Sequence, residues 1–447
     1  MRRAFYSYEV LKTTYLRIAS LHTIQIRSLR IRIGKAFAIV IAALITGGVV
    51  SVLASVFYYP VQSDRLEHTI ASETRDINSL PVVFENATNL TNNPMDSVYG
   101  QVAAWDNNVY MLWQESVPPG YTNYDIFVIT SRDNGTTFGT PVNLSNNPGF
   151  SEHPQIATYD NKVYAIWADD SSGNREVLFT MSQDNGATFE TISNLSNNTS
   201  DSFNQEISVF GDDIYAVWLD REEDGNANIL LRSSADGGAT FGSTVNISNN
   251  ANEETFPKVT AYEGNVYVAW NLIDETLGDR ENQDLFLVKS QDSGNTFGDR
   301  ITLNQENDFG ELQIAAYNET VYVAAGGLHT VGVDGLFFAV STDAGSSFSE
   351  PQTIDENGTF INPLNVEVGA YDEQFSYIAA QVSVSGNEEI LLIEMHGNNS
   401  TRVMNLSNNP GVSECPSIAI AGDNIYVVWE DMTPGNHEIL YAKGSRA

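Results

Sequence analysis

Acidic side chains recur just after tryptophan in this sequence. In four places a carboxylate stands two residues beyond a tryptophan, and further acids follow closely. The group consists of Glu115, Asp169, Asp170, Asp220, Glu222, Asp224 and Asp431. Ca²⁺ is bound in proteins by clustered carboxylate and carbonyl oxygens. If the fold gathers these acids, they form an acidic rim that could bind Ca²⁺ as a cofactor. An evenly acidic, soluble exterior is the alternative interpretation.

A second candidate surface is a column of dissimilar residues, each placed shortly before an alternating apolar run. Its members are Tyr99, His153, Asn204, Phe256, Glu311 and Cys415. Variation on one face of a constant frame is how a scaffold carries specificity. We therefore expect Tyr99, His153 and Phe256 to contact a ligand. Cys415 and His437 could together bind a soft metal, although a single thiol near a single imidazole is usually unrelated to it.

The elements that position both surfaces come from a repeat of about 50 residues that begins near residue 80. One signal is Asn-Leu-Ser-Asn-Asn, and a second is an alternating run such as Val163–Trp167. The third is Ser/Thr-x-Asp-x-Gly-x-Thr/Ser-Phe, with successive aspartates 51, 52, 56 and 51 residues apart. These aspartates are Asp133, Asp184, Asp236, Asp292 and Asp343. Each period contains four short segments rich in β-branched and aromatic residues, which predicts a four-stranded propeller blade.

The repeat predicts an all-β fold, a seven-bladed β-propeller over residues 80–447, with six or eight blades as the error of the count. The last repeat ends after its third strand, at Glu438–Lys443. Residues 81–90 resemble the missing fourth strand. We expect this N-terminal strand to complete the last blade, because closing the ring removes exposed strand edges.

The five aspartate motifs resemble the Asp box of the sialidase-like (BNR-repeat) β-propeller superfamily. In that superfamily the box is a turn on the outer side of the ring, away from the ligand, so the resemblance implies a structural role for the five aspartates. An active sialidase would carry three arginines that clamp a carboxylate, one of them in an Arg-Ile-Pro signature. The sequence contains no Arg-Ile-Pro. Arg175, Arg221 and Arg280 could converge, but their acidic neighbours favour local surface pairing.

The N-terminal region has a different composition. Residues 1–35 hold eight Lys/Arg and one acid, and residues 36–59 carry no charge. Twenty-four residues of helix reach about 36 Å, enough to cross a bilayer core of about 30 Å. The positive-inside rule predicts a cytoplasmic basic arm at 1–35, a transmembrane helix at 36–59, and a stalk at 60–79 leading to an extracellular propeller. A cleaved signal peptide is the alternative.

Net charge and cysteine content limit the functional classes. The chain has 22 basic and 57 acidic residues and a formal charge of −35. Such a surface repels phosphate backbones, which argues against nucleic-acid binding. A single cysteine excludes an internal disulfide. Thirteen Asn-x-Ser/Thr sequons follow residue 80, so the exterior part could be glycosylated.

These patterns together predict a membrane-anchored, cell-surface propeller that binds without catalysis. The expected partners are a glycan, a protein of the envelope, or cations. A sialidase-like exo-glycoside hydrolase and a structural component of a surface layer remain alternatives.

Overall fold

The computed structural model describes residues 40–46, 49–55, 82–118, 123–222, 225–248, 253–273, 283–304, 309–327, 335–354 and 361–446. Its contacts divide the chain into two compact units, residues 1–80 and 81–447.

The first unit contains an antiparallel pair of strands, β1 (Val40–Thr46) and β2 (Val49–Ser55). We expected one transmembrane helix over 36–59, and the structure differs here. Two runs rich in valine, isoleucine and alanine flank a Gly-Gly dipeptide, a sequence that also suits a two-residue hairpin. Among the described residues, no helix has the length and apolarity needed to cross a membrane. The basic arm at 1–35 and the stalk at 60–79 lie outside the described residues.

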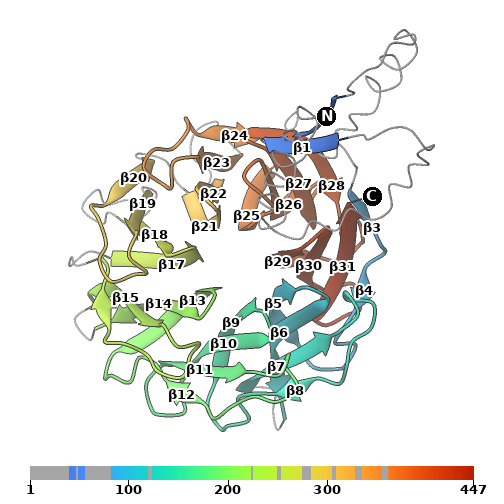
Figure 1. The fold of residues 1–447 in the computed structure, drawn as a ribbon. Coiled ribbons are helices and arrows are strands. Elements are labelled where there is room, and N and C mark those ends of the chain that lie inside the picture. The colour runs from blue at the N-terminus through green and yellow to red at the C-terminus, as the bar shows by residue number, and fades with distance from the viewer. Residues whose placement is uncertain are drawn as a thin grey trace, which may run out of the picture. The chain divides into compact units, whose positions relative to one another are not determined.

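The second unit is a seven-bladed β-propeller, as predicted (Figure 1). Each blade is an antiparallel sheet whose first strand lies nearest the centre. The first three blades are β5 (Ser97–Trp105) to β8 (Val142–Asn143), β9 (Ser151–Tyr159) to β12 (Ser193–Asn194), and β13 (Asp201–Phe210) to β16 (Val245–Asn246). The next three are β17 (Glu253–Tyr262) to β20 (Ile301–Asn304), β21 (Phe309–Tyr317) to β24 (Gln352–Ile354), and β25 (Ile361–Ala370) to β28 (Asn399–Asn405).

The second and third strands of each blade supply most of the core. They are β6 (Asn108–Val117) and β7 (Asn123–Ser131), β10 (Lys162–Asp169) and β11 (Glu176–Ser182), β14 (Asp213–Arg221) and β15 (Ala227–Ser234), β18 (Asn265–Ile273) and β19 (Gln283–Ser290), β22 (Thr320–Gly327) and β23 (Leu336–Ser341), and β26 (Phe375–Val384) and β27 (Asn387–His396). Second strands are buried on both faces because each blade packs against two neighbours. Tyr164 and Trp218, from adjacent blades, belong to one such buried cluster.

The seventh blade contains both ends of the second unit. Its strands β29 (Ser413–Ala421), β30 (Asn424–Asp431) and β31 (Glu438–Arg446) are completed by β3 (Val82–Phe84) and β4 (Thr88–Asn89). Val82 pairs with Arg446, and Asn89 pairs with Leu440. The predicted N-terminal closing strand is therefore present, divided in two.

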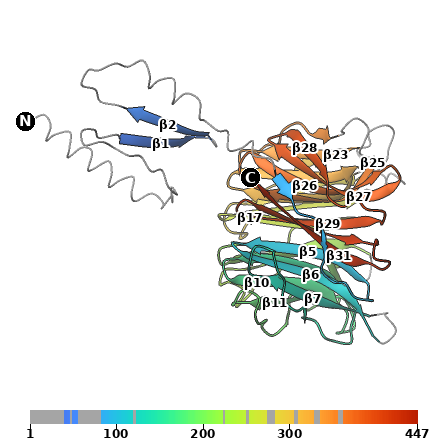
Figure 2. The same ribbon diagram turned by 90° about the vertical axis from the view of Figure 1, so that its right-hand side faces the viewer.

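The strands run from one face of the ring to the other (Figure 2). Because the strands within a blade are antiparallel, the loops between blades and the loops from second to third strand share one face, here called the entry face. The turns from first to second strand and the Asp boxes share the opposite face, here called the box face. This arrangement separates the predicted variable column from the Asp boxes.

Candidate binding site at the centre of the propeller

A β-bulge interrupts the first strand of each blade near the entry face. In the first blade the register shifts between Val98 and Gln101. The residue at the bulge has a positive φ: 53° at Tyr99, 51° at His153, 47° at Phe256 and 48° at Cys415. A bulky residue held in the left-handed region costs about 1–3 kcal/mol, and such strain concentrates at functional sites.

Side chains from the preceding blade stabilise these bulges. The backbone N–H of His153 donates to Oε1 of Gln114 at 2.8 Å, and that of Cys415 donates to Oε1 of Gln381 at 3.4 Å. Each acceptor lies on the second strand of the blade before. The strained backbone is therefore fixed by contacts between blades, which makes the position of the bulge residue depend on closure of the ring.

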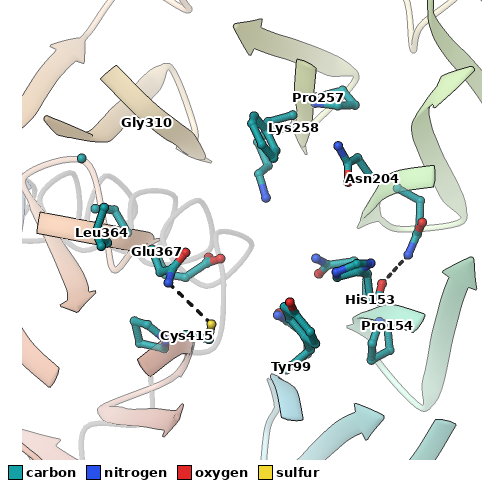
Figure 3. Close-up of a pocket in the computed structure, with 18 of the residues that line it drawn as sticks. Tyr99, His153, Pro154, Asn204, Pro257, Lys258, Gly310, Leu364, Glu367 and Cys415 are labelled. Atoms are coloured by element: carbon teal, nitrogen blue, oxygen red, sulfur yellow. Dashed lines mark hydrogen bonds between the residues drawn. The ribbon is translucent and has the colours of Figure 1, made fainter. Parts of the chain in front are cut away.

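The bulges converge on a cavity of about 500 Å³ at the centre of the entry face (Figure 3). Tyr99, His153 and Phe256 all line it, as do Asn204 and Cys415. The rings of Tyr99 and His153 meet edge to face with centroids 4.5 Å apart. Tyr99 and Phe256 are 38% and 37% exposed, although both are large and apolar. Three members of the predicted column thus contribute partly exposed aromatic rings to the cavity lining.

Amide and charged side chains complete the lining. Gln101, Gln155 and Gln205 face the cavity beside the aromatic residues. Lys258 extends toward the centre in Figure 3, and its Nζ lies 3.3 Å from Glu206 Oε2. On the other side, Gln313 donates to Oε1 of Glu367 at 2.6 Å. The cavity therefore combines aromatic surface with hydrogen-bond donors and acceptors.

Asn365 is a bulge residue that the sequence did not reveal as part of the variable column. It has φ 42° and takes the bulge position in the sixth blade. Its Nδ2 donates to Gln381 Oε1 at 2.7 Å and contacts Cys415 Sγ at 3.5 Å. In the other described blades, the bulge residue stands eleven positions before the tyrosine of the second strand, as Tyr99 stands before Tyr110. The same count from Tyr377 in the sixth blade gives Val366 instead of Asn365. The turn of the sixth blade is one residue longer, which hid the match. The side chain of Glu311 lies outside the described residues.

The carboxylates that follow tryptophan do not form an open acidic rim. Asp169, Asp220 and Asp431 are 1%, 7% and 0% exposed. Asp431 Oδ2 accepts hydrogen bonds from Asn409 at 2.6 Å, Ser413 at 3.0 Å and the Trp429 indole at 3.2 Å. Each of these acids is thus committed to the turn that joins two blades.

The other acids of the predicted group behave similarly or are exposed. Glu115 Oε2 accepts from Asn93 at 2.9 Å and from the Trp113 indole at 3.1 Å. Asp170 accepts from the backbone of Phe150 at 2.6 Å. Glu222 is exposed, and Asp224 lies outside the described residues.

Hydrogen bonding lowers the pKa of two of the buried acids, Asp169 and Asp431. Burial alone would raise the pKa of Asp431, but donors from Thr433, Asn409 and Ser413 outweigh it and lower the pKa from its ordinary value. Asp169 has the same balance, and its pKa is also lowered. Among the described residues, no group of three or more His, Cys, Asp or Glu side chains is arranged to hold a metal ion.

Cys415 and His437 have separate partners. Cys415 contacts Asn365, whereas His437 Nδ1 lies 3.5 Å from Glu430 Oε2. The adjacent Glu430 carboxylate raises the pKa of His437 against the opposing effect of burial. Burial first, and then the Glu430 charge, raises the pKa of Glu414. The seventh blade therefore holds a compact titratable cluster near the cavity.

The Asp boxes form closed local networks on the box face. In the first box, Ser131 Oγ donates to Asp133 Oδ1 at 2.8 Å, and Thr137 donates to both carboxylate oxygens at 2.8 and 2.7 Å. The other four boxes repeat these bonds around Asp184, Asp236, Asp292 and Asp343. These bonds lower the pKa of each aspartate to about 2.

The two candidate arginines that the structure describes, Arg175 and Arg221, do not line the cavity. Arg175 Nε pairs with Glu152 at 2.8 Å. The guanidinium groups of Arg175 and Arg221 lie 5.9 and 5.3 Å from the ring centroid of Phe203. Arg280 lies outside the described residues. The two described arginines therefore converge on an aromatic ring and an acid rather than on the cavity.

Comparisons with known proteins agree with this fold. Residues 87–387 match the family described as BNR repeat-like domain. No curated protein matches the sequence. A solved protein of unknown function from Dyadobacter fermentans has 12% identity and a TM-score of 0.52, covering 82% of this chain and 99% of that one.

Two sialidases are also similar in structure. The phage phi92 endosialidase has 12% identity and a TM-score of 0.50, with 81% of this chain and 69% of that chain covered. The Trypanosoma rangeli sialidase in complex with sialic acid has 14% identity and a TM-score of 0.45, covering 68% of this chain. This chain covers 55% of that sialidase's length. At these identities the likeness concerns the fold alone.

Proposed function

We propose that this chain, which belongs to the family of BNR repeat-like domains, binds a glycan without catalysis in its central cavity. The observation that supports the proposal is the group of partly exposed aromatic residues, Tyr99, His153 and Phe256, held in strained bulges at a cavity of about 500 Å³. That volume falls within the range of small-molecule sites, about 300–1,000 Å³.

The chemistry of the lining suits a sugar. The aromatic faces can pack against the apolar C–H face of a sugar ring, and amide groups both donate and accept hydrogen bonds. Gln101, Gln155 and Asn204 supply such amides beside the rings. Lys258 and Glu367 add one charge of each sign, which favours a neutral or zwitterionic glycan over a strongly acidic one.

The test uses the full chain on a glycan array, followed by titration calorimetry with the strongest hit. Tyr99→Asn and Phe256→Asn remove the rings while keeping a residue that tolerates positive φ, because asparagine already occupies this position at Asn204 and Asn365. We expect each change to weaken binding at least tenfold. Val142→Ala, an exposed residue outside the cavity lining, is the control. Unchanged affinity in both asparagine variants would contradict the proposal.

The second candidate is a sialidase-like glycoside hydrolase, and the Glu414–Glu430 pair favours it. These residues are directly opposite one another on β29 and β30, and the pKa of Glu414 is raised, as a general acid requires. The test is hydrolysis of chromogenic glycosides, sialosides included, by the full chain. Turnover that is lost in Glu414→Gln would show that the chain is a hydrolase and would contradict binding without catalysis.

We further propose that residues 36–59 anchor the chain in a membrane, with the propeller outside the cell and glycosylated at some sequons. The uncharged stretch and the preceding basic arm support this. Protease added to intact cells should remove the propeller and leave the basic arm protected. Release of the full chain by carbonate washing would contradict anchoring.

A further inference from the structure

A ladder of aromatic rings lines the box face, at the other end of the first strands. Each ring belongs to the residue that closes the first hairpin of its blade. Trp105 and Tyr159, Tyr159 and Phe210, Phe210 and Tyr262, and Tyr262 and Tyr317 have centroids 4.4, 5.6, 4.8 and 5.2 Å apart. Consecutive blades therefore place consecutive rings side by side.

The ring contacts described run from the first blade to the fifth, and the seventh blade carries no ring at the corresponding position. Ala421 pairs with Asn424 as Trp105 pairs with Asn108 and Tyr159 with Lys162, so alanine occupies the position of the rings. A pocket of about 460 Å³ opens at this place, between the first and seventh blades. Trp105 and Ala421 both line it, whereas Tyr159, whose ring centroid is 4.4 Å from that of the indole, does not. The pocket is the place where the next ring of the ladder would stand.

Polar side chains surround the pocket. Asp106, Asn107, Asp423 and Asn424 come from the two hairpin turns that flank it. Asp423 Oδ1 also accepts a hydrogen bond from the Tyr371 hydroxyl at 3.1 Å, which fixes its orientation. The rim thus presents carboxylate acceptors together with amide donors and acceptors.

We propose that this pocket is a second saccharide-binding site, in which one sugar ring stacks on Trp105 and takes the place of the missing aromatic ring. Sugar hydroxyls donate and accept, so they use both carboxylates and amides of the rim. An ammonium ligand donates only and would leave the amide donors without partners. The site lies on the box face and is independent of the central cavity.

The saccharide could come from a separate glycan or from this chain itself. Asn134 lines the same pocket and begins an Asn-Gly-Thr sequon. Bacterial expression without glycosylation isolates the first source. Expression with glycosylation, compared with Asn134→Gln, tests the second, because an attached sugar seated in the pocket would protect Trp105 from a soluble quencher.

Trp105 provides a specific signal. The chain has six tryptophans, and the other five are at most 2% exposed. We would titrate the unglycosylated full chain with methyl β-glucoside, methyl β-galactoside, methyl α-mannoside and N-acetylglucosamine, and follow quenching by acrylamide. At least one probe should shield Trp105. Ala421→Trp fills the pocket and should weaken that effect at least tenfold, whereas Ala421→Ser leaves the pocket open and should retain it.

Two results would overturn the inference. The first is a double negative result. No sugar probe changes acrylamide quenching of the unglycosylated chain, and Asn134→Gln does not change the quenching of the glycosylated chain. The other is that protection survives in Ala421→Trp but disappears in Phe256→Asn, which would assign the effect to the central cavity. Ala421→Trp could disturb the packing of the blade, so Trp105→Ala serves as a second variant. Saturation-transfer NMR would measure transfer from the protein to the bound sugar, and loss of this transfer in Trp105→Ala supports the site.

Discussion

The backbone N–H of Tyr99, in the first blade, donates a hydrogen bond of 2.7 Å to Oε1 of Glu430, in the seventh. This bond joins residues 331 positions apart and stabilises a bulge with φ 53°. Gln114 performs the same role for His153 between the first and second blades. This contact therefore joins the cavity lining directly to the interface between the first and seventh blades.

Glu430→Ala should destabilise the propeller by about 1–3 kcal/mol, because it leaves the Tyr99 N–H of a strained bulge without its acceptor. Glu430→Gln keeps an acceptor, as Gln114 shows in the next blade, and should cost less. Urea unfolding of both variants measures the difference. Equal stability of the two would mean that the acceptor has no role in closure.

Stability should fall as pH rises above 6.5, the ordinary pKa of histidine, and His437 is the reason. Its pKa is raised above the ordinary 6.5, chiefly by Glu430, so its contribution is complete below pH 6.5 and is lost as pH passes the folded-state pKa. Glu414, whose pKa is also raised, acts in the same direction just above pH 4.5. Glu430→Gln should flatten this dependence and lower the pKa of His437 in an NMR titration. An unchanged titration would exclude the contact.

The Asp boxes should produce the opposite dependence at low pH. Each aspartate has a pKa of about 2 against an ordinary 3.8, so its contribution is present above pH 3.8 and is lost as pH falls toward about 2. Asp133→Asn should reduce the steepness of acid unfolding followed by circular dichroism. The same steepness in wild type and variant would show that the Asp133 network persists in the unfolded chain.

Gly135→Ala should destabilise more than Gly211→Ala. Both glycines have positive φ, 74° and 66°, so alanine strains both by about 1–2 kcal/mol. A Cβ at position 135 would also collide with the Tyr441 hydroxyl of the neighbouring blade, whereas position 211 has nothing within 4 Å. The difference in melting temperature measures the packing of an Asp box against the next blade. Equal losses would mean that the box contributes no such packing.

Asp431→Ala should cost about 3 kcal/mol, since it leaves buried donors from Asn409, Ser413 and Trp429 without an acceptor. Glu222→Ala, at an exposed acid, should stay within about 0.5 kcal/mol. Neither Ca²⁺ nor EDTA should move the melting temperature, whereas a site filled at a hundredfold excess over Kd would add about 2.7 kcal/mol. A large Ca²⁺ shift would restore the cation hypothesis.

The blades could be predicted from the repeat because its two strongest signals, the Asp box and the strand ending in tryptophan, report structure through neighbouring residues of the sequence. The Asp box specifies its own turn, and the strand ending in tryptophan is buried wherever it occurs. Where such strands served as a reference, the residues of the variable column line the central cavity, as His153 does. The same approach did not find Asn365, because the sixth blade has neither an Asp box nor the strand tryptophan, and the turn between its first and second strands has one extra residue.

Side-chain direction after a strand was harder to predict. Asp169 and Asp431 follow tryptophan at a strand end, and the sequence cannot tell whether the carboxylate faces solvent or the adjoining turn. The answer depends on Asn147 and Asn409, each 22 residues away, which donate to these acids. Tertiary contacts of this kind, and the pocket at Ala421, become visible only when neighbouring blades are placed together.

The seventh blade combines strands from both ends of the propeller, and this also fixes the order in which the blades can be completed during synthesis. β3 leaves the ribosome first among the propeller strands but pairs with β31, which is made last. Six blades can therefore assemble while β3 remains unpaired, and the ring closes only once β31 has been made. A nascent or truncated chain keeps an unpaired strand edge, so quality control could distinguish incomplete copies by that edge alone.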